Sequence, residues 1–190
     1  MTLLVGGALA EAVGGLGFDV RVKWPNDLLL MCADGRRRKV AGILTEAATD
    51  GDRVGQVVVG IGLNVNETTF PEDLADRATS LRLASAGEAP LRRADVLARV
   101  LGAVERAYER FREAGPTAAI ALWEAHAELG RPCRASVEGH TISGVMAGIA
   151  ADGALLIQDA SGVRHRVVAG EVVLADGLSP AASPSERAFR

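Results

Sequence analysis

The sequence is poor in cysteine and carries no excess of positive charge. Its 190 residues include two cysteines, Cys32 and Cys133, which lie far apart and form no CxxC pattern. A structural zinc site is therefore not expected, and the scarcity of thiols is typical of proteins from a reducing compartment. The 21 basic residues are dispersed and the formal net charge is −3, which argues against a nucleic-acid-binding surface.

The sequence also lacks a targeting signal and a long apolar run. A secretory signal begins with a positively charged region, but no basic residue precedes Arg21, and Glu11 interrupts the apolar N-terminal segment. No segment reaches the roughly 18 continuous apolar residues of a membrane helix. Because 48% of the residues are hydrophobic, the chain can still form a packed core. We therefore expect a soluble cytoplasmic protein without a membrane-bound part.

A polar corner between two apolar runs is the first feature that suggests a site. Residues 20–23 alternate between apolar and basic side chains, the period-two pattern of a half-buried strand, and residues 28–31 predict a second strand. The segment Lys23-Trp24-Pro25-Asn26-Asp27 between them contains a proline and two turn formers. A lysine, an amide and a carboxylate thus meet at one rigid corner. Alone, this pattern fits a solvated hairpin tip as well as a functional site.

Two later segments predict strands that carry glycine in their interior. Residues 38–46 read RKVAGILTE, and residues 57–66 read VVVGIGLNVN. Glycine weakens a strand and often marks the close approach of a ligand or another backbone. The second segment does not fit a dinucleotide-binding loop, because Val65 stands where the third glycine is required and the segment continues as a strand.

Helical patterns dominate the chain between these strands and residue 130. Residues 92–114 predict a helix whose apolar stripe lies in the core. The stripe consists of Leu97, Leu101, Val104, Tyr108 and Phe111. We predict further helices at residues 2–13, capped by Thr2, and at residues 118–129, and a short helix that opens at residues 70–73.

After Gly130-Arg131-Pro132 the pattern changes to short alternating runs separated by turn signals. These runs are residues 133–137, 142–149, 154–158, 164–168 and 172–174. Five short strands within about 45 residues fit a small SH3-like barrel. We therefore predict a first domain over residues 1–129, the barrel over residues 130–175 and a disordered tail over residues 176–190.

The segments KWPND, KVAGIL and GIGLNVN, in this order and spacing, resemble the catalytic core of biotin protein ligases. The resemblance extends from Leu3 to Leu174. It implies an α+β fold in which a mixed sheet with helices, similar to class II aminoacyl-tRNA synthetases, precedes the SH3-like barrel. The implied activity is the ATP-dependent conversion of biotin to biotinyl-AMP, followed by transfer to a lysine of the biotin carboxyl carrier protein of acetyl-CoA carboxylase. Residues 1–129 would then be a partial catalytic domain.

The resemblance also implies roles for individual residues. Lys39 would bridge the biotin carboxyl group and the α-phosphate, and Asp27 would position the acceptor lysine and take its proton. Lys23 can add positive charge at the phosphates, which adenylation requires. The residues implied to line the biotin pocket are Gly42, Ile43, Gly60 and Gly62, and those implied near the phosphates and Mg²⁺ are Asn26 and Asn64. The expected ligands are ATP, Mg²⁺ and biotin, and the expected partners are the carrier protein and a second copy of the chain.

Two parts of the family pattern have no counterpart in this sequence. They are a G-R-G-R-x-G loop with its biotin-contacting strand, and the DNA-binding domain of repressor-type members. We therefore expect a fragment, a mis-started reading frame or a natural remnant, which alone binds biotin and ATP poorly. Two other functions stay open: a lipoate or octanoate transferase of the same fold, and a non-enzymatic truncated scaffold that binds the carrier protein. The KWPND and GIGLNV segments and the predicted barrel favour biotin.

Overall fold

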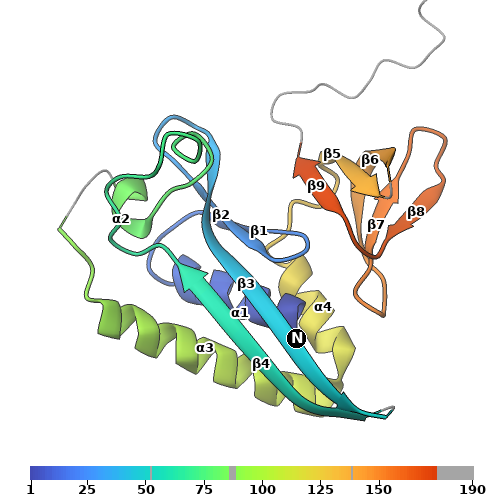
Figure 1. Ribbon diagram of the computed structural model, residues 1–190, viewed down its shortest axis with the longest axis horizontal. Coiled ribbons are helices and arrows are strands. Elements are labelled where there is room, and N and C mark those ends of the chain that lie inside the picture. Colours follow the sequence, from blue (N-terminus) through green and yellow to red (C-terminus); the bar gives the residue numbers. More distant parts are fainter. Residues whose placement is uncertain (52, 86–88, 138, 175–190) are drawn as a thin grey trace, which may run out of the picture. The chain divides into compact units, whose positions relative to one another are not determined.

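The computed structural model describes residues 1–51, 53–85, 89–137 and 139–174 (Figure 1). The chain forms two compact units, Met1–Ala127 and a second that begins at Glu128. The predicted tail, residues 176–190, lies outside the described residues. Within the described ranges, no helix is long and apolar enough to cross a membrane.

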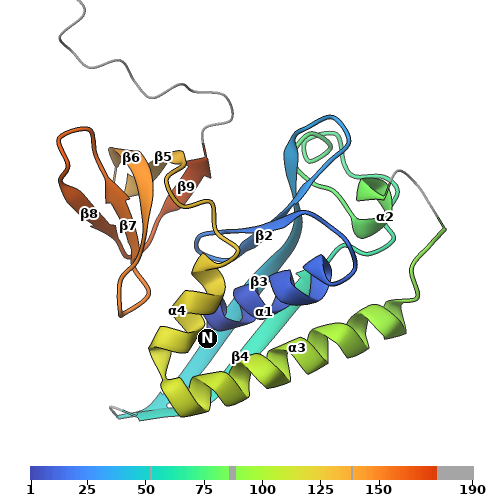
Figure 2. The same cartoon turned by 180° about the vertical axis from the view of Figure 1, so that it is seen from behind.

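The first unit combines an antiparallel sheet with helices on one of its faces. The strands β1 (Val20–Lys23), β2 (Asp27–Met31), β3 (Arg37–Asp50) and β4 (Arg53–Leu63) lie side by side in chain order. The helices are α1 (Thr2–Gly14), α2 (Leu81–Ala84), α3 (Arg93–Ala114) and α4 (Pro116–Glu124). Figures 1 and 2 show α1, α3 and α4 together on one face of the sheet. The opposite face of β3 and β4 leaves Leu44 and Val58 exposed.

This architecture confirms the predicted combination of sheet and helices. The named strands pair antiparallel, and the two parallel pairings reported in the described part of the chain are single bridges, Val22 with Ala127 and Lys39 with Ala78. The strands predicted at residues 38–46 and 57–66 are joined by a shorter connection than their spacing suggested, because β3 and β4 continue to a tight turn in which Asp50 pairs with Arg53. Gly51 has a φ of +58° in this turn, a conformation that glycine adopts without strain.

Three predicted helix boundaries differ from the structure. Thr2 does not cap α1, because it is already the first helical residue and its hydroxyl donates to Thr45 Oγ1 at 2.9 Å. Residues 70–73 form no helix, and a turn closed by hydrogen bonds to the Pro71 carbonyl follows instead. Helix α4 ends at Glu124, so His126 lies beyond it in a half-buried turn, where burial lowers the pKa of its imidazole.

Helix α3 forms where predicted but buries a different face. Leu97, Leu101 and Tyr108 of the predicted core stripe are 56%, 59% and 45% exposed. The buried residues are Val96, Val100, Ala103 and Ala107. This face packs against α1, whose buried side includes glycine and alanine, so the two helices approach closely and small residues fill the contact. The predicted core assignment of the stripe is therefore wrong.

Two adjacent glycines of α1 give a test of this close packing. A Cβ at Gly7 would lie 2.7 Å from Leu122 Cγ and 3.0 Å from the Leu122 carbonyl, whereas a Cβ at Gly6 would make an ordinary 3.5 Å contact with Trp123. Gly6→Ala should therefore raise the free energy of unfolding by up to roughly 1 kcal/mol, the usual gain of alanine in a helix. Gly7→Ala should lower it, because overpacking costs about 1–3 kcal/mol. Urea unfolding of both variants measures the difference, and equal effects would contradict this packing.

The second unit is a five-stranded antiparallel sheet. Its strands β5 (Pro132–Val137), β6 (His140–Ile149), β7 (Leu155–Gln158), β8 (Arg164–Val167) and β9 (Glu171–Leu174) lie in the order β8-β7-β6-β5-β9. One face buries an apolar core that includes Cys133, Met146 and Leu155. The five predicted strands are confirmed. Among the described residues no ladder joins the edge strands β8 and β9, so the sheet does not close into a barrel.

Candidate functional site

Four residues that the sequence singled out form one row across the sheet. Lys23 of β1 pairs with Asp27 of β2, Asp27 pairs with Gly42 of β3, and Gly42 pairs with Gly62 of β4. Residues directly opposite one another in an antiparallel ladder share a face. The row therefore places two charged side chains beside two glycines on a single surface.

A β-bulge brings Lys39 onto this same surface. Asp27 pairs with Gly42 and Leu28 with Ala41, but Leu29 pairs with Lys39, so Val40 is an extra residue in β3. Without the bulge, Lys39 and Gly42 would point to opposite faces, because side chains alternate along a strand. With it, Lys39 faces the same way as Asp27 and Gly42. Val40 and Ala41 are consecutive buried residues, which marks the break in alternation.

The Lys39 side chain crosses Gly42 and reaches Asp27. Lys39 Nζ lies 2.5 Å from Asp27 Oδ1, and a Cβ at Gly42 would lie only 3.3 Å from both Nζ and Cε of Lys39. Asp27 Oδ1 is shielded from solvent and accepts no aligned hydrogen bond within the described ranges. Its close polar contact is thus the Lys39 ammonium, and the missing side chain at Gly42 leaves the path between them clear.

The backbone of Lys39 is held on the side away from β2. Its N–H donates to the Arg77 carbonyl at 2.8 Å, and its carbonyl accepts from the Thr79 N–H at 2.8 Å. Two hydrogen bonds in opposite directions fix both the position and the orientation of this residue. The rigid attachment confines the freedom of Lys39 to its side chain.

An open hollow of about 440 Å³ lies on β3 and β4 near this pair. It is lined by Asn26, Gly42, Ile43, Leu44, Gly60, Ile61 and Gly62. The four residues that the resemblance implied for a biotin pocket are all among these, and Leu44 and Ile61 are additions. The sequence signal that could have found them is their closeness to strand glycines, since Leu44 is two residues from Gly42 and Ile61 stands between Gly60 and Gly62. Ile43 contributes mainly backbone, because its side chain is buried and its Cδ1 would lie 3.6 Å from a Cβ at Gly6.

Asn26 fixes one end of the hollow through a pair of hydrogen bonds. Its side-chain amide donates to the Ile43 carbonyl at 2.9 Å, and its own carbonyl accepts from the Ile43 N–H at 2.9 Å. The corner predicted from the KWPND segment is therefore joined to the middle of β3. Trp24 is buried beside it, and the Trp24–Pro25 peptide bond is cis.

Asn64 lies outside the lining of the hollow and is engaged in backbone contacts. Its side-chain amide donates to the Thr79 carbonyl at 3.1 Å, its N–H donates to the Val40 carbonyl, and its carbonyl accepts from the Leu81 N–H. It thus joins β3 to the segment that holds the Lys39 backbone. The phosphate or metal role implied by the resemblance stays a prediction.

Replacing Asn64 separates these two roles. Asn64→Ala should lower the free energy of unfolding by about 1–3 kcal/mol, because the Thr79 carbonyl loses its donor. Asn66→Ala is the control, since it removes two side-chain hydrogen bonds with Leu91, one more than Asn64→Ala removes, at a neighbouring asparagine outside the proposed site. Urea unfolding measures the loss of stability, and calorimetry measures ATP binding. A stable Asn64→Ala chain with weakened ATP binding would contradict the structural role and support the phosphate role.

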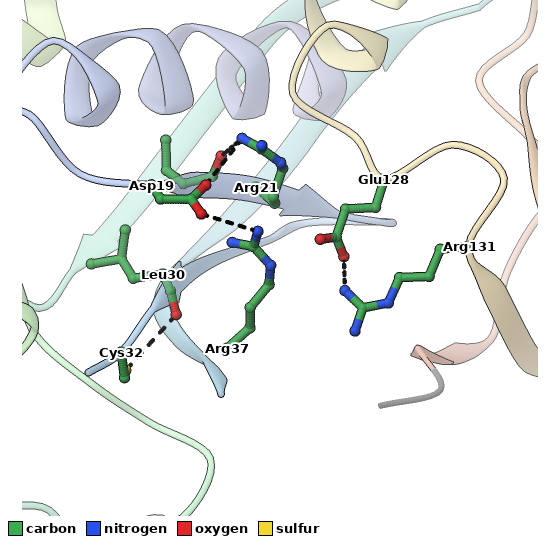
Figure 3. A network of polar contacts seen from close by, with 8 residues as sticks. Asp19, Arg21, Leu30, Cys32, Arg37, Glu128 and Arg131 are labelled. Carbon is green, nitrogen blue, oxygen red and sulfur yellow. Dashed lines mark hydrogen bonds and ion pairs between the residues drawn. The ribbon is translucent and has the colours of Figure 1, made fainter. Parts of the chain in front are cut away.

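The basic side chains next to Lys39 already have acidic partners. Arg37 pairs with Asp19 at 3.3 Å, and Arg38 pairs with Asp34 at 2.5 Å. Figure 3 shows Asp19 between Arg21 and Arg37. The Asp34 carboxylate raises the pKa of the Arg38 guanidinium. Lys23 is part of the row and Lys39 contacts its Asp27, so these two lysines are the cations that we assign to the site. The described residues include no group of three His, Cys, Asp or Glu side chains that could hold a metal ion.

Two family models match the chain, one in each unit. The model of the biotin/lipoate A/B protein ligase family matches residues 2–64, which contain the whole row and the hollow. The model of the biotin protein ligase C-terminal domain matches residues 129–175.

Sequence relatives and solved structures agree with these models. The bifunctional ligase/repressor BirA of Bacillus subtilis is 37% identical over 168 residues, which are 86% of this chain and 50% of the relative. The biotin–[acetyl-CoA-carboxylase] ligase of Mycobacterium tuberculosis is 32% identical over 91% of this chain and 61% of its own length. The apo biotin protein ligase of Aquifex aeolicus superposes with a TM-score of 0.76 at 29% identity, covering 92% of this chain and 74% of that one. The chain spans about half the length of the BirA relatives it matches.

Proposed function

The chain belongs to the biotin protein ligase family, and on this premise we propose that its first unit converts biotin and ATP to biotinyl-AMP and transfers biotin to a lysine of a carrier protein. The observation that carries the proposal is the Lys39–Asp27 ion pair across Gly42, beside a hollow with a glycine floor. A biotin protein ligase from Aquifex aeolicus whose fold this chain shares has been solved with biotin and ATP, which supports the same ligands here.

In the first step, a carboxylate oxygen of biotin attacks the α-phosphorus of ATP. A new P–O bond forms, the bond to the β-phosphate oxygen breaks, and pyrophosphate leaves. Negative oxygens crowd together in the transition state, so fixed positive charge lowers the barrier. We assign this charge to Lys39, whose backbone N–H and carbonyl are both hydrogen-bonded. Lys23 is the second cation of the row. The exposed backbone at Gly42, Gly60 and Gly62 leaves space for the biotin rings.

In the second step, the acceptor lysine attacks the acyl carbon of biotinyl-AMP. An ammonium cannot attack until it loses a proton, and a carboxylate within reach can orient it and accept that proton. We assign this role to Asp27, which is 18% exposed and therefore accessible from the open face. The C–N bond then forms, the acyl C–O bond breaks, and AMP leaves with the electron pair.

Magnesium fits this site as an ion carried by the nucleotide. Mg²⁺ is usually held by one or two protein groups together with substrate phosphates and water. The described part of the chain offers no cluster of acidic or imidazole ligands, so a protein cage does not fit. The amide oxygens of Asn26 and Asn64 are the groups that would help the phosphate oxygens to hold the ion. The ion would offset the negative charge of the phosphates.

We further propose domain bounds of 1–129 for the synthetase-like catalytic part and 130–175 for an SH3-like module. The division between Ala127 and Glu128 and the C-terminal family match support these bounds. The five antiparallel strands in the order β8-β7-β6-β5-β9 support such a module. We also propose that the protein is cytoplasmic and that it associates with a second copy of itself.

Competition between acids tests the proposed function. The 190-residue chain is incubated with ATP labelled at the α-phosphate and with biotin, lipoate or octanoate, and acyl-adenylate is quantified together with transfer to a biotin carboxyl carrier domain. We expect more adenylate and more transfer with biotin than with lipoate or octanoate. A preference for lipoate or octanoate would favour the transferase, which the biotin/lipoate family model also covers. Binding of the carrier domain without any adenylate would favour the scaffold.

A further inference from the structure

We propose that Lys39 and the acceptor lysine take turns as the counter-ion of Asp27. The inference rests on the proposed function, in which adenylation precedes transfer, and adds to it a single position that the two ammonium groups occupy in turn. It starts from one contact: the residue assigned to the phosphate and the residue assigned to the acceptor lysine are paired with each other at 2.5 Å. While this pair persists, a ligand of either group must compete with the other member of the pair.

The two partners differ in their freedom to leave the pair. The Lys39 side chain is 47% exposed and lies over Gly42, which offers no side chain to hold it. Its backbone is fixed by Arg77 and Thr79, so departure requires only rotation of the side chain. Asp27 is a short side chain in the middle of the row between β1 and β3, and it is 18% exposed. Lys39 is therefore the member that moves, and the hollow beside Gly42 is on its path.

Departure of Lys39 leaves a carboxylate oxygen in need of a cation. Asp27 Oδ1 is shielded from solvent and accepts no aligned hydrogen bond from the described residues. A shielded charge without a partner is costly, so the vacated position favours another cation. Lys23 lies opposite Asp27 in the ladder but forms no ion pair with it within the described residues. An acceptor lysine enters from the open face and carries the same ammonium group as the Lys39 side chain that it replaces.

In this exchange each negative group keeps one ammonium partner at each stage. The adenylate phosphate takes the Lys39 ammonium, and Asp27 takes the acceptor ammonium. Asp27 then accepts one proton, the neutral amine attacks the acyl carbon, AMP departs as the acyl C–O bond breaks, and the second proton of the attacking nitrogen passes to the departing phosphate or to water. Before adenylation the Lys39 ammonium is paired with Asp27 Oδ1, so an acceptor lysine that arrives early must compete with it for the carboxylate.

A double-mutant cycle on ligand affinity tests the exchange. The probe is an unreactive biotinyl adenylate in which a methylene replaces the acyl carbonyl, and calorimetry gives Kd for the 190-residue chain and for Asp27→Asn, Lys39→Ala and the double variant. If the phosphate must take Lys39 from Asp27, Asp27→Asn should tighten binding about fivefold in the presence of Lys39 and leave it unchanged without Lys39, a coupling within the usual range for contacting residues. Asp19→Asn removes a carboxylate of the same unit that pairs with Arg21 and Arg37, and it should change nothing.

A second arm follows the acceptor. Nα-acetyl-lysine methylamide should bind the probe-loaded chain at least tenfold more tightly than the free chain, and linkage requires the same factor in reverse. Asp27→Asn should abolish this difference. Equal tightening by Asp27→Asn with and without Lys39, or equal affinity of the lysine amide for free and loaded chain, would overturn the exchange alone. A wild-type chain that does not bind the probe would overturn the proposed function and the exchange with it.

Discussion

Replacing Lys39 with alanine should slow biotinyl-AMP formation by roughly 10²–10³-fold, the usual effect of removing one preorganised group from a developing negative charge. The structure explains why a single lysine should matter this much. Its backbone is held by hydrogen bonds to Arg77 and Thr79, and the bulge at Val40 directs its side chain to the face of the hollow. Release of pyrophosphate with saturating biotin and ATP measures the effect.

Two further variants define the origin of this loss. Lys39→Arg should restore little activity, because a planar guanidinium presents its charge differently from an ammonium and is larger above Gly42. Lys23→Ala should slow adenylate formation less than Lys39→Ala does. Lys23 is only the second cation of the row, and it is joined to Asp27 through the β1–β2 backbone pairing. Pyrophosphate release by Lys39→Ala at a near-normal rate would show that the phosphate charge is met elsewhere.

Replacing Asp27 with asparagine should separate the two steps of the reaction. Adenylate synthesis should be largely preserved, while transfer from pre-formed biotinyl-AMP to the acceptor lysine should slow by about 10²–10⁴-fold, the typical contribution of a positioned general base. The amide keeps the shape of the turn but cannot accept the proton of an ammonium. Single-turnover rates of each step, measured on the same preparation, determine where the loss occurs.

A purely structural role for Asp27 predicts a different result. Asp27 follows Asn26 and is the first residue of β2. If its role were only to shape this turn, replacing it would affect folding. In that case adenylation and transfer should fall together and the melting temperature should drop. An unchanged melting temperature combined with selective loss of transfer would establish the chemical role, and a parallel loss of both steps would contradict it.

The parts of this site that depend on local sequence were predictable, and the parts that depend on three-dimensional register were not. The hairpin around Pro25 and the two glycine-bearing strands follow from alternation and turn chemistry, which are short-range signals. The ion pair of Lys39 with Asp27 depends on the extra residue Val40, and a bulge has no reliable signature in a single sequence. The resemblance suggested roles for both residues but not their contact.

Helix α3 shows the same limit in the core. The sequence predicted the helix correctly, but the predicted buried face is rotated by about a quarter-turn from the observed one. The large apolar residues were assigned to the core, whereas smaller residues occupy it. The contact is decided by α1, where Gly7 faces Leu122 of α4 and small residues face α3. Which of two adjacent apolar faces is buried depends on the partner's shape, and a partner's shape is not encoded in the helix itself.

The bulge at Val40 also makes the contact between Lys39 and Asp27 depend on the number of residues that separate Lys39 from Gly42. Lys39 and Gly42 are three residues apart, an odd separation that would normally direct them to opposite faces, and one unpaired residue corrects the parity. Deleting Val40 would remove the unpaired residue together with the odd spacing, so a regular strand would still present Lys39 and Gly42 on one face. Loss of the bulge without a deletion would instead act on the side chains as a frameshift acts on codons: every amino acid named in the site would still be present, yet the lysine would point into the helices while the carboxylate faced the ligand. A related chain in which these two residues are two apart should therefore form the pair without a bulge.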